Sequence, residues 1–170
     1  MPFVVFWIVA MVLILLEGAL LSSLGVVTLA LHLPVVVAIY LGIERDFATG
    51  GLLLVALLIP VEWVVAGVPG VYSMALAVVY LVMSGLRGQV QQGWGVARAL
   101  AAGIGSLLHS LVMVGLFLGM GEPSLSVAVA WMIVPSVVIV AAVTVVVGRG
   151  LSRLDRMVDP RRGRSRLEFS

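Results

Sequence analysis

Long apolar runs fill almost the whole chain, and the charged side chains gather at the ends of these runs. Hydrophobic residues make up 62% of the 170 residues and charged residues 11%, whereas soluble domains are about 45–50% apolar and about 25% charged. A water-soluble fold has nowhere to place so much apolar surface. The sequence therefore predicts an all-α, polytopic membrane protein whose helices cross the bilayer several times.

Short groups of glycine, proline, serine or charged residues separate the apolar runs and mark the expected helix ends. A helix needs roughly 20 mostly apolar residues to cross the hydrocarbon layer of a membrane. We therefore expect a six-helix transmembrane bundle over residues 1–148, followed by a cytoplasmic arginine-rich tail over residues 149–170. The expected spans are residues 3–21, 25–43, 48–66, 71–86, 98–119 and 124–147.

The arginines orient these spans. All ten basic residues are arginines, and seven of them lie between Arg149 and Arg166. Because arginine favours the cytoplasmic side of short loops, we expect the tail in the cytoplasm, and an even number of spans then places the N-terminus there too. Arg45, Arg87 and Arg98 fall in or beside connections that are cytoplasmic in this topology, whereas the outer connections contain no basic residue.

The arginines of the tail are candidates for contact with anionic lipid or with cytosolic partners, and the charge of the tail does not indicate nucleic-acid binding. Leu151, Leu154 and Val158 recur among them at helical spacing until Pro160. This spacing is typical of a short amphipathic helix on the inner membrane surface, although a disordered tail would explain the composition equally well. The candidate contact residues are Arg149, Arg153, Arg156, Arg161, Arg162, Arg164 and Arg166.

Four ionisable side chains fall inside the expected spans, namely Glu17, His32, Glu62 and His109. Such groups are costly in a bilayer, so each is a functional candidate. At a rise of about 1.5 Å per residue, the first three lie at similar depth in the outer third of the membrane. If the first three spans are neighbours, these residues form one polar cluster. The cluster could serve as a proton-coupled site, a substrate pocket or a partner surface, or it could be a hydrogen-bonded set that fixes helix register.

His109 lies near the middle of the fifth expected span. At helical spacing it shares one face with Gly105, Ala102 and Arg98. Small residues in such a stripe let two helices approach closely. We interpret the stripe as a helix-packing surface and His109 as a hydrogen-bonded packing histidine, with a ligand or proton role as the alternative.

The sequence offers no catalytic or metal-binding pattern. It contains no cysteine, which excludes thiolate zinc sites and cysteine nucleophiles. It also has no His-Glu-x-x-His run, no Gly-x-Ser-x-Gly elbow and no cluster with the spacing of metal ligands. We therefore expect a protein that is not an enzyme and that uses no metal and no cofactor.

Three stretches in the middle of the chain resemble the rod shape-determining MreD family. They are the proline-led segment 33–41, the segment 58–62 that ends in an acidic residue, and the glycine- and proline-containing turn 67–73. Pro135 and the stretch 153–156 resemble the end of that family's sequences. The chain departs from the family at its acidic position, where aspartate in a Gly-Leu-x-x-Asp context is usual and this chain has glutamate.

The resemblance implies a non-enzymatic component of the bacterial cell-elongation complex, which builds peptidoglycan, in the inner (cytoplasmic) membrane. Its implied partners are MreC, the RodA glycosyltransferase, a penicillin-binding transpeptidase and the actin-like MreB. The implied fold is a six-helix bundle similar to the substrate-binding subunits of energy-coupling-factor vitamin transporters, so a vitamin-uptake subunit is the alternative function. The expected outer connections, residues 22–23, 67–70 and 119–123, are too short to form a lid over a captured vitamin, which favours the scaffold.

Overall fold

The computed structural model describes residues 3–23, 32–64, 68–91 and 95–158, and the regular structure within them is entirely helical. The all-α class expected from the sequence is thereby confirmed for these residues. The helices are α1 (Phe3–Ser23), α2 (Leu33–Glu44), α3 (Phe47–Val64), α4 (Val71–Gly85), α5 (Arg87–Gln91), α6 (Gly95–Gly119) and α7 (Pro123–Val158).

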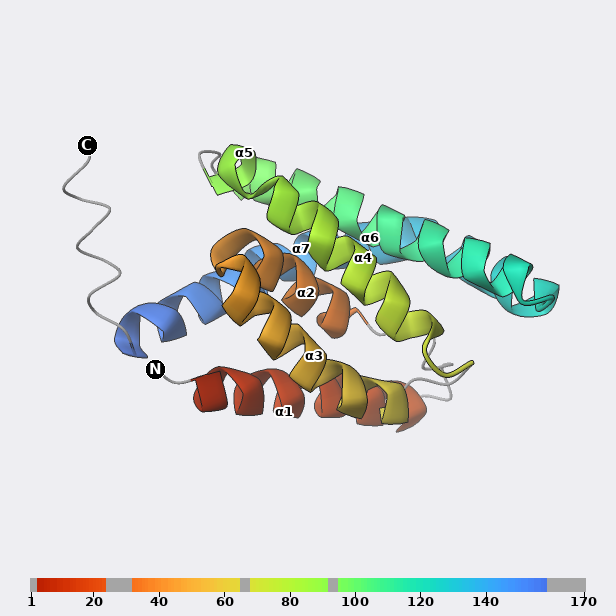
Figure 1. Ribbon diagram of the computed structural model, residues 1–170, viewed down its shortest axis with the longest axis horizontal. Helices are drawn as coiled ribbons and strands as arrows, with labels where there is room; N and C mark the ends of the chain where they lie inside the picture. The colour runs from red at the N-terminus through yellow and green to blue at the C-terminus, as the bar shows by residue number, and fades with distance from the viewer. Residues whose placement is uncertain (1–2, 24–31, 65–67, 92–94, 159–170) are drawn as a thin grey trace.

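The consecutive long helices alternate in direction, running back and forth between the two ends of the molecule (Figure 1). Helix α1 lies along the lower edge of this view and α6 along the upper edge, with α2 between them. Helix α2 packs against every other helix, and all its residues from Pro34 to Ile43 are buried. This central position explains why α2 is apolar on all sides and not only on one face.

Three described helical segments are long and apolar enough to cross a membrane: Phe47–Val64, Ala97–Gly119 and Pro123–Thr144. Shorter apolar helices occur at Val4–Leu20, Leu33–Glu44 and Val71–Gly85. Large apolar side chains also cover the outside of the bundle, as shown by Trp63 and Trp131, which are 88% and 82% exposed. A surface of this kind suits lipid and not water, so the chain is a membrane protein.

The second expected span differs from the expectation, whereas the first part of the tail takes the helical form, one of the two forms expected for it. Helix α2 begins at Leu33 and not near Gly25, and residues 24–31 lie outside the described part of the chain. Helix α7 continues without a break through the first arginines of the tail to Val158. The glycines at 148 and 150 weaken a helix by only about 1 kcal/mol each, whereas Pro160 disfavours helical geometry in the residue before it.

The connection between the fourth and fifth expected spans, residues 87–97, contains the short helix α5 and the start of α6. Residues Arg161, Arg162, Arg164 and Arg166 lie outside the described residues.

Two glycines lie where α2 packs closely against its neighbours α4 and α6. A Cβ atom on Gly42 of α2 would lie 2.8 Å from the Met83 Cβ and 3.1 Å from the Tyr80 carbonyl oxygen of α4. A Cβ atom on Gly105 of α6 would lie 2.8 Å from the Ile39 Cδ1 of α2. At Gly42 the contact with the α4 backbone needs a residue without a side chain, as is common where membrane helices cross.

Polar contacts tie the helices together at the end where α2 finishes and α3 and α6 begin. The Glu44 carboxylate lies 2.7 Å from the Arg98 guanidinium. The Asp46 carboxylate accepts a hydrogen bond from the Thr49 N–H at 3.0 Å in the first turn of α3. The Tyr80 hydroxyl donates to the Phe47 carbonyl at 2.6 Å. This end therefore joins α2 to α6 and α3 to α4.

The ion pair between Glu44 and Arg98 is expected to contribute little stability. Its side chains are 17% and 36% exposed, and partly exposed pairs contribute about 0.2–1 kcal/mol, less at high salt. Arg98→Ala should therefore lower the unfolding free energy by about 0.5 kcal/mol in low salt, measured by unfolding in detergent micelles. An equal loss when Glu44 is already alanine would show that Arg98 acts through other contacts.

Candidate functional site

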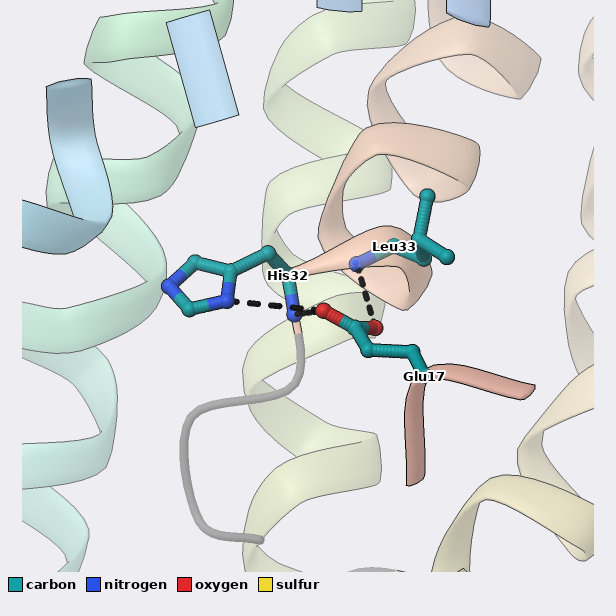
Figure 2. Close-up of polar contacts among 3 residues, drawn as sticks. All are labelled: Glu17, His32 and Leu33. Atoms are coloured by element: carbon teal, nitrogen blue, oxygen red, sulfur yellow. Dashed lines mark hydrogen bonds and ion pairs between the residues drawn. The ribbon is translucent and has the colours of Figure 1, made fainter. Parts of the chain in front are cut away.

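A carboxylate from α1 caps the first turn of α2. Glu17 Oε1 accepts a hydrogen bond from the His32 backbone N–H at 2.8 Å, and Oε2 accepts one from the Leu33 N–H at 2.9 Å. The His32 Nδ1 lies 3.5 Å from the same Oε1. Figure 2 shows the carboxylate facing the start of α2, with the imidazole beside it. Glu17 and His32, which the sequence placed at similar depth, are therefore in contact.

The start of α2 has backbone N–H groups that need an acceptor from outside the helix. The first N–H groups of a helix have no partner within the helix, and they carry a partial positive charge. Pro34 has no N–H, so His32 and Leu33 supply the two donors that Glu17 binds. No side chain from the helix's own N-cap bonds to it. A negative side chain from another helix replaces the local cap, and its hydrogen bonds are strengthened by charge.

Glu62 does for α4 what Glu17 does for α2. Its Oε2 accepts a hydrogen bond from the Gly70 N–H at 2.9 Å, and its Oε1 accepts one from the Ser73 N–H at 2.9 Å and one from the Ser73 hydroxyl. Gly70 adopts a φ of 88°, a left-handed conformation that favours glycine. The turn before α4 is thereby folded back so that its N–H groups meet the end of α3.

Glu17, His32 and Glu62 thus lie in two capping sites. The described contacts of Glu62 lead to Gly70 and Ser73, whereas those of Glu17 lead to His32 and Leu33. Tyr72, at the start of α4, is buried and lies within electrostatic range of both carboxylates. The two sites are therefore neighbours, and each carboxylate binds the start of a different helix.

A small polar cavity lies beside His32, between α2, α6 and α7. Its volume is about 20 Å³. The hydroxyl-bearing residues Ser106, Ser110 and Ser136 are only 2%, 5% and 9% exposed. The cavity is lined by His32, Val35, Ser106, His109, Ser110, Met113, Val129, Met132, Ser136 and Val140.

His109 is a buried member of this cavity and is 6% exposed. Its ring meets the Tyr72 ring edge to face, with centroids 4.8 Å apart and an interplanar angle of 72°. Its Nε2 is buried and has no hydrogen-bond partner among the described residues. A buried ring nitrogen without a partner is uncommon in native proteins and calls for an explanation.

The rest of the expected packing stripe faces neighbouring helices. Ala102 is fully buried, and Gly105 contacts Ile39 of α2. Arg98, one turn before Ala102, reaches Glu44 at the end of α2. The stripe therefore packs α6 against α2, and His109 continues it towards the cavity.

The serines of this cavity were not predicted from the sequence. Ser106, His109, Ser110 and Met113 recur at positions three and four residues apart, which places them on one face of α6. This polar stripe inside an apolar helix is a signal that the sequence contains. Ser136 comes from α7 and has no such signal, because its place at the cavity depends on how α7 packs.

The chemistry available here is hydrogen bonding and proton exchange. Among the described residues, no group of three or more histidine, cysteine, aspartate or glutamate side chains is placed to hold a metal ion. Comparison with known proteins gives no further guide, since no family model, no curated protein and no solved structure matches the chain.

Proposed function

We propose that this protein is a non-enzymatic scaffold of the bacterial cell-elongation complex, of the type represented by MreD, in the cytoplasmic membrane. The proposal starts from the resemblance of residues 33–41, 58–62 and 67–73 to that family. Its partners would be MreC, RodA and the penicillin-binding transpeptidase within the membrane, with MreB on the cytoplasmic side.

The hydrogen bonds of the polar residues in these stretches carry the proposal. Glu62 lies in the second stretch, and both its oxygens bind backbone and side-chain donors of the third. The first stretch forms α2, whose start is held by Glu17 in the same way. The carboxylates therefore stabilise the fold and are not left open for a substrate, as expected of a protein that presents a surface.

The size of the cavity beside His32 also supports a scaffold over a vitamin-uptake subunit. Pockets for small organic ligands have volumes of about 300–1,000 Å³. The space of about 20 Å³ in this cavity suits a water molecule and not a vitamin.

The proposed topology has six antiparallel spans, counting α1 to α4, α6 and α7, with both termini in the cytoplasm. The alternating helix directions support it (Figure 1), as do the arginines in or beside the expected cytoplasmic connections and in the tail. In this arrangement the exposed apolar faces contact lipid or the helices of partners. The end of α7, with Arg149, Arg153 and Arg156, lies on the cytoplasmic side, where anionic lipid and MreB are available.

The proposal predicts that tagged protein purified from its native membrane in mild detergent carries MreC, RodA or the transpeptidase, identified by mass spectrometry. A tagged membrane protein of unrelated function from the same cells is the control. Trp63→Ala on α3 and Trp131→Ala on α7 remove exposed aromatic side chains from different helices, so selective loss of a partner assigns the face that binds it. Recovery of an ATPase pair with a coupling subunit, or of none of the elongation proteins, would contradict the proposal.

A further inference from the structure

We propose that the cavity between α2, α6 and α7 binds ordered water that links His32 to His109. The water would extend the Glu17–His32 pair into a buried hydrogen-bonded chain from α1 to α6 and α7. This inference does not depend on the proposed function, because it rests on the cavity and its side chains alone.

One ring nitrogen of His109 is buried and needs a polar partner. The side chain is buried, its Nε2 has no partner among the described residues, and it lines the cavity. A neutral imidazole has one donor and one acceptor nitrogen, so Nε2 needs a partner in either tautomer. Tyr72 of α4 packs against the His109 ring edge to face, and the cavity that His109 lines offers hydroxyl groups as polar partners.

The cavity matches a water molecule in size and in polar partners. A buried water needs about 10–15 Å³ of space for its centre and two to four polar partners. The cavity offers about 20 Å³ and the hydroxyl groups of Ser106, Ser110 and Ser136. Serine hydroxyls can both donate and accept, so they suit a water in any orientation.

The His32 ring has one nitrogen beside Glu17 and the other directed away from it (Figure 2). Its Nδ1 lies 3.5 Å from Glu17 Oε1. Its other ring nitrogen points away from Glu17 (Figure 2) and belongs to a ring that lines the same cavity as His109. A carboxylate beside one nitrogen holds the proton there, which leaves the other nitrogen to accept a hydrogen bond from water.

The remaining lining of the cavity selects a small neutral occupant. Val35, Met113, Val129, Met132 and Val140 form its apolar wall. The lining contains no carboxylate and no arginine, so an ion would meet no opposite charge there. A chain of Glu17, His32, water and His109 can share a proton between helices without carrying a charged ligand.

Solid-state nuclear magnetic resonance of the full-length protein in lipid bilayers tests this inference. The chain has only two histidines, so isotopically labelled histidine gives ring signals from His32 and His109 alone. Magnetisation transferred from water should reach the ring nitrogens of both residues. A His109 ring that receives none, in a sample where His32 does, would overturn the inference.

A pair of serine variants separates ordered water in the cavity from general exposure to solvent. Ser136→Val fills space in the cavity and should abolish the water-derived signal of His109. Ser126→Val is the control, because Ser126 is also buried on α7 but its hydroxyl bonds to the Pro123 carbonyl of its own helix at 2.8 Å. An undiminished signal in folded Ser136→Val protein would also count against the inference, and if that variant does not fold, the wild-type spectrum decides alone.

Discussion

Replacing Glu62 with alanine should lower the free energy of unfolding by about 2–4 kcal/mol, because it leaves several donors without a charged acceptor. These donors are the Gly70 N–H, the Ser73 N–H and the Ser73 hydroxyl. In a membrane, water cannot freely replace the lost acceptor. Unfolding with sodium dodecyl sulfate in mixed micelles, followed by circular dichroism, gives the difference.

Two further variants show whether this loss comes from the cap. Glu62→Gln keeps one acceptor oxygen and loses the charge, so it should cost about 1 kcal/mol, less than alanine. Glu122→Ala removes an exposed carboxylate and should change stability by less than about 0.5 kcal/mol. If Glu62→Ala unfolded at the same detergent fraction as Glu122→Ala, the cap would be energetically unimportant.

Replacing Gly42 with alanine should also be strongly destabilising, by about 1–3 kcal/mol, because the added methyl group overpacks the contact between α2 and α4. The new Cβ would lie 2.8 Å from the Met83 Cβ, 3.1 Å from the Tyr80 carbonyl oxygen and 3.2 Å from the Ser84 nitrogen. Two of these are backbone atoms, which cannot move without shifting α4. The same unfolding titration measures the effect.

Gly115 provides the matched control for this substitution. It lies inside α6, and a Cβ added there meets no atom within 4 Å. Gly115→Ala should therefore leave packing unchanged and stabilise the helix by up to about 1 kcal/mol, through the better helix propensity of alanine. The two glycine variants should change stability in opposite directions. A Gly42→Ala protein at least as stable as the wild type would show that α2 and α4 are not tightly packed.

Where local residues determine a helix end, the sequence predicted it closely. The third and fourth spans were expected at residues 48–66 and 71–86, and helices α3 and α4 occupy Phe47–Val64 and Val71–Gly85. Asp46 caps the first of these helices, and the turn that ends at Gly70 precedes the second. Both signals lie within a few residues of the helix end that they mark.

The start of α2 could not be predicted in this way, because it depends on a residue from another helix. Glu17 is 15 residues from His32 in sequence, and an apolar run gives no indication that the helix starts at its middle. Central burial of α2 removes the polar face that would otherwise have shown its boundaries. The helix in the first part of the tail was one of the two forms expected from the spacing of Leu151, Leu154 and Val158, because arginine-rich sequence continues a helix as readily as it leaves one.

The sequence predicted the level at which the candidate residues lie along their helices, but not the direction in which each helix faces. Counting residues along the helices placed Glu17 and His32 at one level, and they are in contact. Whether Glu62 joins them depends on which way α3 faces. The Glu62 side chain is directed to the start of α4. Likewise, the helical stripe of Ser106, His109 and Ser110 was visible in the sequence, whereas Ser136 depended on the packing of α7.

The two carboxylate caps also bear on the order in which this chain is made. Glu17 precedes the His32 N–H that it binds by 15 residues, and Glu62 precedes the Gly70 N–H by 8 residues. A ribosome therefore synthesises each cap before the helix start that it satisfies. When the first turn of α2 or α4 folds, its acceptor is already present on the preceding helix. Each pair can thus fold as a hairpin without leaving these backbone donors unpaired, which gives folding a direction from the N-terminus to the C-terminus.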